Sequence, residues 1–289
     1  MDSWISILEQ FNSRELAFFV WIFLLGIWAL NHKSIRESVN NVFKTFFNRT
    51  MLTITTSMIF YICFIVLLLK YIGYWDYGLL KDTIFWIIGV SFIQLFNLNK
   101  PEYENGFFIK IFKDNLKFII IFEFLVNLFT FNFWTELILL PLYTAIVAVY
   151  TVSDLDEKYN PAKKLTENIL VGVGFVIILF ISIKTFQEFS IIFTLDNFRN
   201  IGLPILLTIG YLPFLYFMAL FMSYESLFVR ISVFLKENED ISRVAKERII
   251  LKFNLNLKKL NQFKKTFLLE LFKLDDKTKI VKIINDYKY

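Results

Sequence analysis

Seven long apolar runs separated by polar segments dominate the pattern of hydrophobic and polar positions along this chain. A helix needs about 20 apolar residues to cross the hydrocarbon core of a bilayer. Shorter runs are extended by flanking Trp and Tyr residues, whose rings favour the headgroup level. The pattern predicts an all-α membrane protein, a seven-transmembrane-helix bundle with a helical C-terminal cytoplasmic tail. The predicted spans are roughly 16–30, 51–69, 83–97, 118–133, 137–153, 169–183 and 201–224.

Basic residues orient this predicted bundle. All 31 Lys and Arg residues lie outside the seven runs; 26 fall in the even-numbered gaps and the tail, and 5 in the odd-numbered gaps. Cytoplasmic loops retain Lys and Arg because these residues resist translocation. We therefore expect a multi-pass protein of the bacterial inner (plasma) membrane, with its N-terminus outside and its C-terminus in the cytoplasm.

The domain organisation follows from the same pattern, with a transmembrane bundle over 1–224 and a basic, amphipathic helical tail over 225–289. The tail carries 15 basic and 9 acidic residues. Positive charge beside the cytoplasmic leaflet favours anionic inner-leaflet lipids as partners, and argues against nucleic acid. The segments 31–50 and 106–117 also show helical apolar spacing with interspersed basic residues. Both are predicted to lie along the inner leaflet, either bracing the bundle or sensing lipid.

The tail contains an apolar heptad pattern. Its apolar positions follow one another at steps of three and four, which is typical of a coiled-coil seam. One interpretation is packing against the tail's own short helix over 280–284. The other is a homo-oligomer formed through the tail, and a cytoplasmic protein partner is a further use of this segment. The candidate seam residues are Ile250, Phe253, Leu257, Leu260, Phe267 and Leu271.

Polar residues form stripes inside two predicted spans. Glu123 and Asn127 are four residues apart, which places them on one helical face together with Thr130. A carboxylate inside a span is costly unless it is neutral, paired or hydrated. In the third span Ser91, Gln94 and Asn97 form a second stripe. These six residues are candidates for a polar conduit, although interhelical hydrogen bonds would use the same residue types.

Proline and glycine mark the last two spans. Pro204 and Pro213 interrupt the backbone hydrogen bonding of the seventh span, with Gly210 between them. These three residues form a candidate hinge. Gly172 and Gly174 are expected to let the sixth span approach a neighbour closely.

Catalytic motifs are missing from the sequence. The chain has one histidine, His32, and one cysteine, Cys63, and it lacks the nucleophile, phosphate-binding and metal-binding motifs of common enzymes. A Ser or Cys nucleophile would have no neighbouring histidine base. We therefore expect no catalytic residues, no cofactor and no metal. The chain is 56% hydrophobic, as expected for a membrane protein.

Two strings near the N-terminus carry a resemblance. Arg14–Ala17 followed by Trp21, and Gly73–Asp76 followed by Lys81–Trp86, resemble an uncharacterised bacterial multi-pass inner-membrane protein family without an assigned activity. The resemblance implies a multi-pass fold and assigns no functional residues. A small cytoplasmic domain on a compact bundle is also similar, in architecture, to membrane-permeabilising effectors of bacterial antiviral systems.

Three functional hypotheses remain. The first is a non-catalytic, channel-like or membrane-permeabilising effector, with defence against viruses as its setting and an assembling or sensing tail. The second is a secondary transporter of a small solute. Against it stand the missing internal repeat and the single intramembrane carboxylate, because transporter sites lie at repeat interfaces. The third is a structural membrane partner that docks another protein through its tail.

Overall fold

The structure is a computed structural model that describes residues 11–98, 129–187, 194–235, 238–271 and 280–287. Over these ranges about 89% of the residues are helical and none forms a strand, which confirms the all-α prediction. Six helical segments within them are long and apolar enough to cross a membrane. They are α2 (Ser13–Asn31), α4 (Arg49–Tyr71), the segment Tyr77–Asn97, α9 (Phe133–Ser153), the segment Glu157–Gln187 and α12 (Leu195–Phe234).

These six segments match six of the seven predicted spans. Of the remaining one, 118–133, the structure describes 129–133; residues 129–132 are not helical, and Phe133 begins α9. Large apolar side chains on the six segments are widely exposed; in α2, for example, Ala17 is the one buried residue. A soluble protein rarely leaves such continuous apolar surface facing water. The helices therefore indicate a multi-pass membrane protein.

The segment Tyr77–Asn97 is a composite helix. It consists of the 3₁₀ turn η1 (Tyr77–Leu79), α5 (Leu80–Trp86), a π-helical turn labelled η2 (Ile87–Ser91) and α6 (Phe92–Asn97). Asp76 caps its start by accepting a hydrogen bond from the amide of Gly78 over 2.8 Å. The π turn lies near the middle of the predicted third span.

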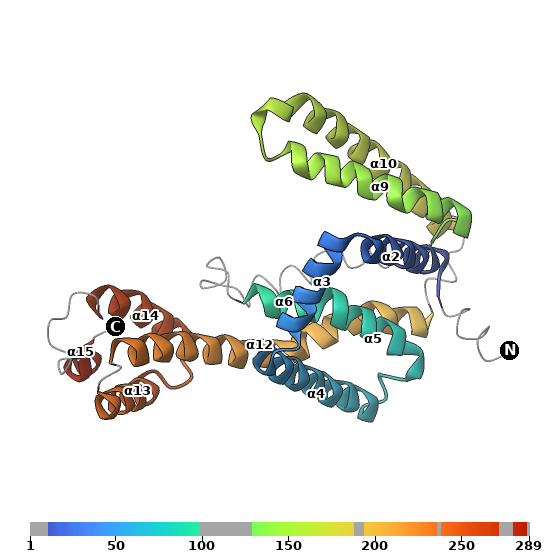
Figure 1. Cartoon of the computed structure of the whole chain (residues 1–289). Coiled ribbons are helices and arrows are strands. Elements are labelled where there is room, and N and C mark those ends of the chain that lie inside the picture. The colour runs from blue at the N-terminus through green and yellow to red at the C-terminus, as the bar shows by residue number, and fades with distance from the viewer. Residues whose placement is uncertain (1–10, 99–128, 188–193, 236–237, 272–279, 288–289) are drawn as a thin grey trace. The chain divides into compact units, whose positions relative to one another are not determined.

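The chain divides into two compact units, residues 1–57 with 117–202 and residues 58–116 with 203–289. In the first unit, α2 begins with a capping box between Asn12 and Glu15. Its Arg14 pairs with Glu136 in the first turn of α9, and the indole of Trp21 donates to the carbonyl of Leu137. Figure 1 shows α2 and α9 running side by side in the same direction from this junction.

The first unit also contains a helical hairpin and one amphipathic helix. The turn η4 (Glu157–Tyr159) joins α9 to α10 (Asn160–Gln187), and Lys163 forms a 2.6 Å ion pair with Asp154 across it. The helix α3 (Lys33–Phe46) occupies the predicted 31–50 segment, and none of its residues is buried. The second predicted surface segment, 106–117, lies outside the described residues.

The second unit is built on α12, a helix of 40 residues. Three further helices, α13 (Glu239–Phe253), α14 (Leu257–Leu271) and α15 (Ile280–Asp286), surround its C-terminal part (Figure 1). Leu227 and Ile231 of α12, with Leu235 directly after it, share one apolar core with Phe253, Leu260, Phe263 and Ile284 of the tail. The predicted boundary at 224/225 therefore falls within an unbroken helix, and the tail packs directly on that helix.

Candidate functional site

The π turn Ile87–Ser91 is the most unusual backbone feature of the second unit. The amide of Phe92 donates to the carbonyl of Ile87, one residue further than in an α-helix. The hydroxyl of Ser91 donates to the same carbonyl over 2.7 Å. Turns of this kind are rare inside α-helices and are frequent at functional sites.

Tyr211 of α12 lies directly against this turn. Its side chain is fully buried, and its hydroxyl donates to the carbonyl of Ser91 over 3.4 Å. Its ring meets Trp86 edge-on at 5.6 Å between centroids and stacks on Phe214 at 5.4 Å. Buried Tyr rings usually find a partner for the hydroxyl, and here that partner is the backbone of the π turn.

Two further polar contacts involve the third span. The indole N–H of Trp86 donates to the hydroxyl of Thr208 on α12 over 3.1 Å, and both residues are buried. The Ser91 hydroxyl lies 3.8 Å from the sulfur of Met58 on α4. In hydrocarbon no water is present to satisfy such groups, so polar atoms must pair with one another. These contacts therefore fix the position of the third span against α12 and against α4.

Gly210 brings α12 and α4 into close contact. A Cβ atom at this position would lie 3.1 Å from Cγ2 of Ile65, and the hydroxyl of Tyr61 donates to the Gly210 carbonyl over 3.3 Å. Pro204 is half-buried and Pro213 is exposed, and α12 continues as one helix through both of them. The predicted hinge residues thus lie in the part of α12 that packs on the π turn.

The predicted conduit residues lie in different parts of the structure. Ser91 is buried in the junction with Tyr211, Gln94 has a buried side-chain oxygen for which the described residues supply no hydrogen-bond partner, and Asn97 ends α6 half-buried. Thr130 belongs to the first unit and lies in a non-helical segment before α9, so helical spacing does not extend the predicted stripe to it. Glu123 and Asn127 lie outside the described residues, and the conduit stays a prediction.

Sequence reasoning missed Tyr211, Trp86 and Thr208, which make most of the contacts at the π turn. A signal was available for Tyr211, because Trp and Tyr favour the ends of membrane spans and Tyr211 lies near the middle of the predicted span 201–224. An aromatic residue with a polar edge must find a partner when it lies within the hydrocarbon. The π turn itself had no recognisable pattern in the sequence.

The candidate seam residues are distributed over two helices. The backbone of Asn254, at φ 44°, ends α13, and α14 begins at Leu257, so the heptad is not one continuous helix. Phe253, Leu260 and Phe267 are buried in the core that the tail shares with α12, Leu257 packs against it, and Ile250 is exposed. Leu271 ends α14, and nothing is described of its side chain. Self-association through the tail stays a prediction.

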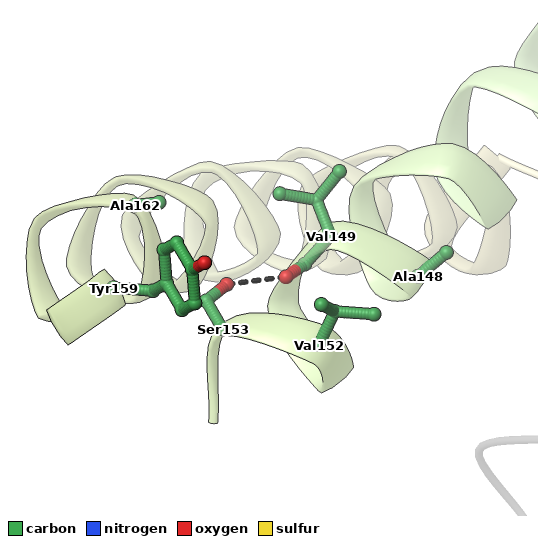
Figure 2. Close-up of a pocket in the computed structure, with 6 residues that line it drawn as sticks. All are labelled: Ala148, Val149, Val152, Ser153, Tyr159 and Ala162. Atoms are coloured by element: carbon green, nitrogen blue, oxygen red, sulfur yellow. Dashed lines mark hydrogen bonds between the residues drawn. The ribbon is translucent and has the colours of Figure 1, made fainter. Parts of the chain in front are cut away.

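A small apolar pocket lies at the hairpin between α9 and α10. It has a volume of about 320 Å³ and is lined by Val149, Val152, Ser153, Tyr159 and two alanines. Figure 2 shows the Ser153 hydroxyl turned to the carbonyl of Val149, to which it donates. Apart from the hydroxyls of Ser153 and Tyr159, the lining side chains are apolar, and none of them is charged.

No metal site is formed by the residues that the structure describes, since no three His, Cys, Asp or Glu side chains come together there. At the α9–α10 hairpin, Asp154 pairs with Lys163 and Asp156 caps η4. Both carboxylates therefore have structural roles.

No protein-family model, no curated protein and no solved structure matches this chain. The similarity of the strings at 14–21 and 73–86 to an uncharacterised multi-pass family thus stays an expectation from the sequence. The residues and their geometry are the basis for any function assigned to the chain.

Proposed function

We propose that this chain is a bacterial inner-membrane protein that works without catalysis, as a channel-like or membrane-permeabilising effector controlled by its C-terminal helices. One observation carries the proposal. The apolar core of the tail includes Leu227 and Ile231 of α12, the same helix that holds Tyr211 against the π turn. A change in the tail therefore changes the surroundings of a helix that runs into the membrane.

The π turn supplies an element that can respond to such a change. Its carbonyl groups are held by side chains, the hydroxyls of Ser91 and Tyr211, in addition to backbone amides. A displacement of α12 by about one residue, roughly 1.5 Å, would break the bond from the Tyr211 hydroxyl to the Ser91 carbonyl and favour an ordinary α-helical turn. In this proposal that rearrangement turns the third span and alters permeability, with the Glu123 face providing the polar lining.

The parallel arrangement of α2 and α9 supports seven crossings. Arg14 in the first turn of α2 pairs with Glu136 in the first turn of α9, so both helices start on the same side of the membrane. Two helices can do so only if an odd number of crossings separates them. Two described spans, α4 and Tyr77–Asn97, lie between them. In this proposal a third crossing within 98–132, the fourth span predicted from the sequence, completes the count, and the distribution of basic residues orients the tail towards the cytoplasm.

Ion flux through liposomes that contain the purified full-length chain tests the proposal. Leu227→Ala removes a fully buried side chain from the shared core, and Val229→Ala is its matched control because Val229 is exposed two residues further along α12. Loss of a buried leucine typically costs about 2–5 kcal/mol. We expect the Leu227 variant to change flux several-fold and the Val229 variant to behave as wild type.

Other results would count against this function. Equal flux in wild type and the Leu227 variant would remove the coupling between tail and bundle. Saturable uptake of one solute with counterflow would instead indicate a transporter.

Glu123→Gln, which keeps the shape of the side chain and removes its charge, should lower the preference for cations if that face lines the path.

A further inference from the structure

The tip of the α13–α14 hairpin is bound to α12 by two tyrosines. The hydroxyl of Tyr224 donates to the carbonyl of Asn254 over 2.7 Å, and the hydroxyl of Tyr216 donates to the carbonyl of Leu255 over 2.5 Å. The amide of Leu257 in turn lies 3.4 Å from the Tyr216 oxygen. The tip therefore lies beside the stretch of α12 between these tyrosines.

This stretch of α12 lies at the edge of the hydrocarbon. The apolar part of the helix extends from Arg199 to Glu225, which at about 1.5 Å per residue is roughly 39 Å. The hydrocarbon core is about 30 Å thick. A helix centred on its apolar part then has residues 202–222 within the hydrocarbon. Tyr216 is inside that range and Tyr224 is just outside it, so the hairpin tip lies at the boundary.

The tip exposes several large apolar side chains. Leu251, Leu255 and Ile250 are 77%, 55% and 47% exposed. Among the tail residues from Asn238 onward whose side chains are described, Val244 is the one further large apolar residue that is exposed. Three of these four exposed apolar side chains thus lie within six consecutive residues, at the end of the hairpin that is bound to α12.

Basic residues flank these leucines. Arg248 is exposed one helical turn before Leu251 on the same face of α13, and Lys258 is exposed in the first turn of α14. Long basic side chains can extend to phosphate groups while apolar neighbours enter the acyl region. Basic residues near an anionic membrane surface strengthen binding to it.

We propose that the hairpin tip, residues 250–255, inserts into the inner leaflet and binds anionic lipid headgroups through Arg248 and Lys258. The tail is then attached to the membrane at two places, through α12 and through this tip. This proposal does not depend on the protein's effect on permeability. It also means that the insertion of the tip depends on the content of anionic lipid in the membrane.

Depth-dependent fluorescence quenching in the full-length protein tests the insertion. A single cysteine carrying an environment-sensitive fluorophore is placed at 251, 255 or 244 in a Cys63→Ala background, since Cys63 is itself exposed. Val244 is the matched control, because it is an exposed residue of α13 two turns further from the tip. The proteins are reconstituted in phosphatidylcholine vesicles, with and without phosphatidylglycerol.

We expect bromine-labelled lipids to quench the labels at 251 and 255 several-fold more than the label at 244. Aqueous iodide should quench the label at 244 most strongly. Phosphatidylglycerol should increase lipid quenching at the tip, and Arg248→Gln with Lys258→Gln should abolish the increase. Equal iodide quenching at all three sites would overturn the proposal. Protection of the tip from both quenchers would also overturn it, because a second protein copy would then cover the leucines.

Discussion

The hydroxyl of Tyr211 donates to the carbonyl oxygen of Ser91 over 3.4 Å, which joins α12 to the last residue of a π turn. This bond lies beside the Trp86–Thr208 bond, so the two helices are held by polar contacts on either side of an aromatic pair. Such contacts have a direction and a fixed reach, whereas apolar packing tolerates sliding. The register of α12 against the third span is therefore set by these side chains.

Substitutions at Tyr211 should separate the contribution of its hydroxyl to stability from the contribution of its ring. Tyr211→Phe removes one hydrogen bond and should lower stability by about 0.6 kcal/mol, the average for interhelical bonds in membranes. Tyr211→Ala removes a fully buried ring and should cost about 3–5 kcal/mol. Unfolding of the purified protein in detergent measures both. Equal midpoints for the alanine variant and wild type would contradict the burial of this ring.

Substitutions at two glycines test whether Gly210 lies at a contact between α12 and α4. A Cβ at Gly210 would lie 3.1 Å from Ile65, whereas a Cβ at Gly172 meets no atom within 4 Å. Gly210→Leu should therefore cost about 1–3 kcal/mol through overpacking. Gly172→Ala should be neutral or stabilise α10 by up to about 1 kcal/mol, because alanine favours the helix. Thermal unfolding in detergent distinguishes the two, and Ile65→Ala should partly rescue the leucine variant.

The sequence predicted the helices well and the contacts between them poorly. Hydropathy and basic residues located six helices that the structure contains, because apolar length is a local property. Gly172 and Gly174 were expected to mark a close approach, yet the space beside both is open, whereas a Cβ at Gly210 would meet Ile65 of α4. A glycine allows close approach without determining which helix comes near it. Ser91 was identified as polar and buried, but its partner Tyr211 lies 120 residues away.

The ion pair between Arg14 and Glu136 should be essential to the first unit. Glu136 is 3% exposed, and it accepts hydrogen bonds from the Arg14 guanidinium and the amide of Phe131. Arg14→Ala leaves this carboxylate buried without its counter-charge, which typically costs 3–5 kcal/mol. The matched control is Arg243→Ala, which breaks an exposed pair with Glu247 and should cost at most about 1 kcal/mol. Similar unfolding midpoints for the two variants would contradict this role.

Introducing a charged residue at apolar positions of the tail distinguishes internal packing from self-association. Leu260 is fully buried in the core shared with α12, whereas Ile250 is 47% exposed. Leu260→Asp should therefore make the tail sensitive to protease, since an unpaired charge in an apolar core is strongly disfavoured. Ile250→Asp should leave protease resistance unchanged. If the wild type is an oligomer in detergent and Ile250→Asp alone dissociates it, a seam between chains would be indicated instead.

The orientation of α2 and α9 makes the topology testable with few fusions. Because both helices start at the Arg14–Glu136 pair, their C-terminal ends should emerge on the same side of the membrane. Reporter fusions after Asn48 and after Tyr159 should therefore both report cytoplasm. If residues 98–132 did not cross, the chain between these sites would cross three times rather than four, and the two reporters would disagree. The remaining fusions set the absolute orientation, with cytoplasm expected after Asn115 and Tyr289 and the exterior after Gly73 and Asp196.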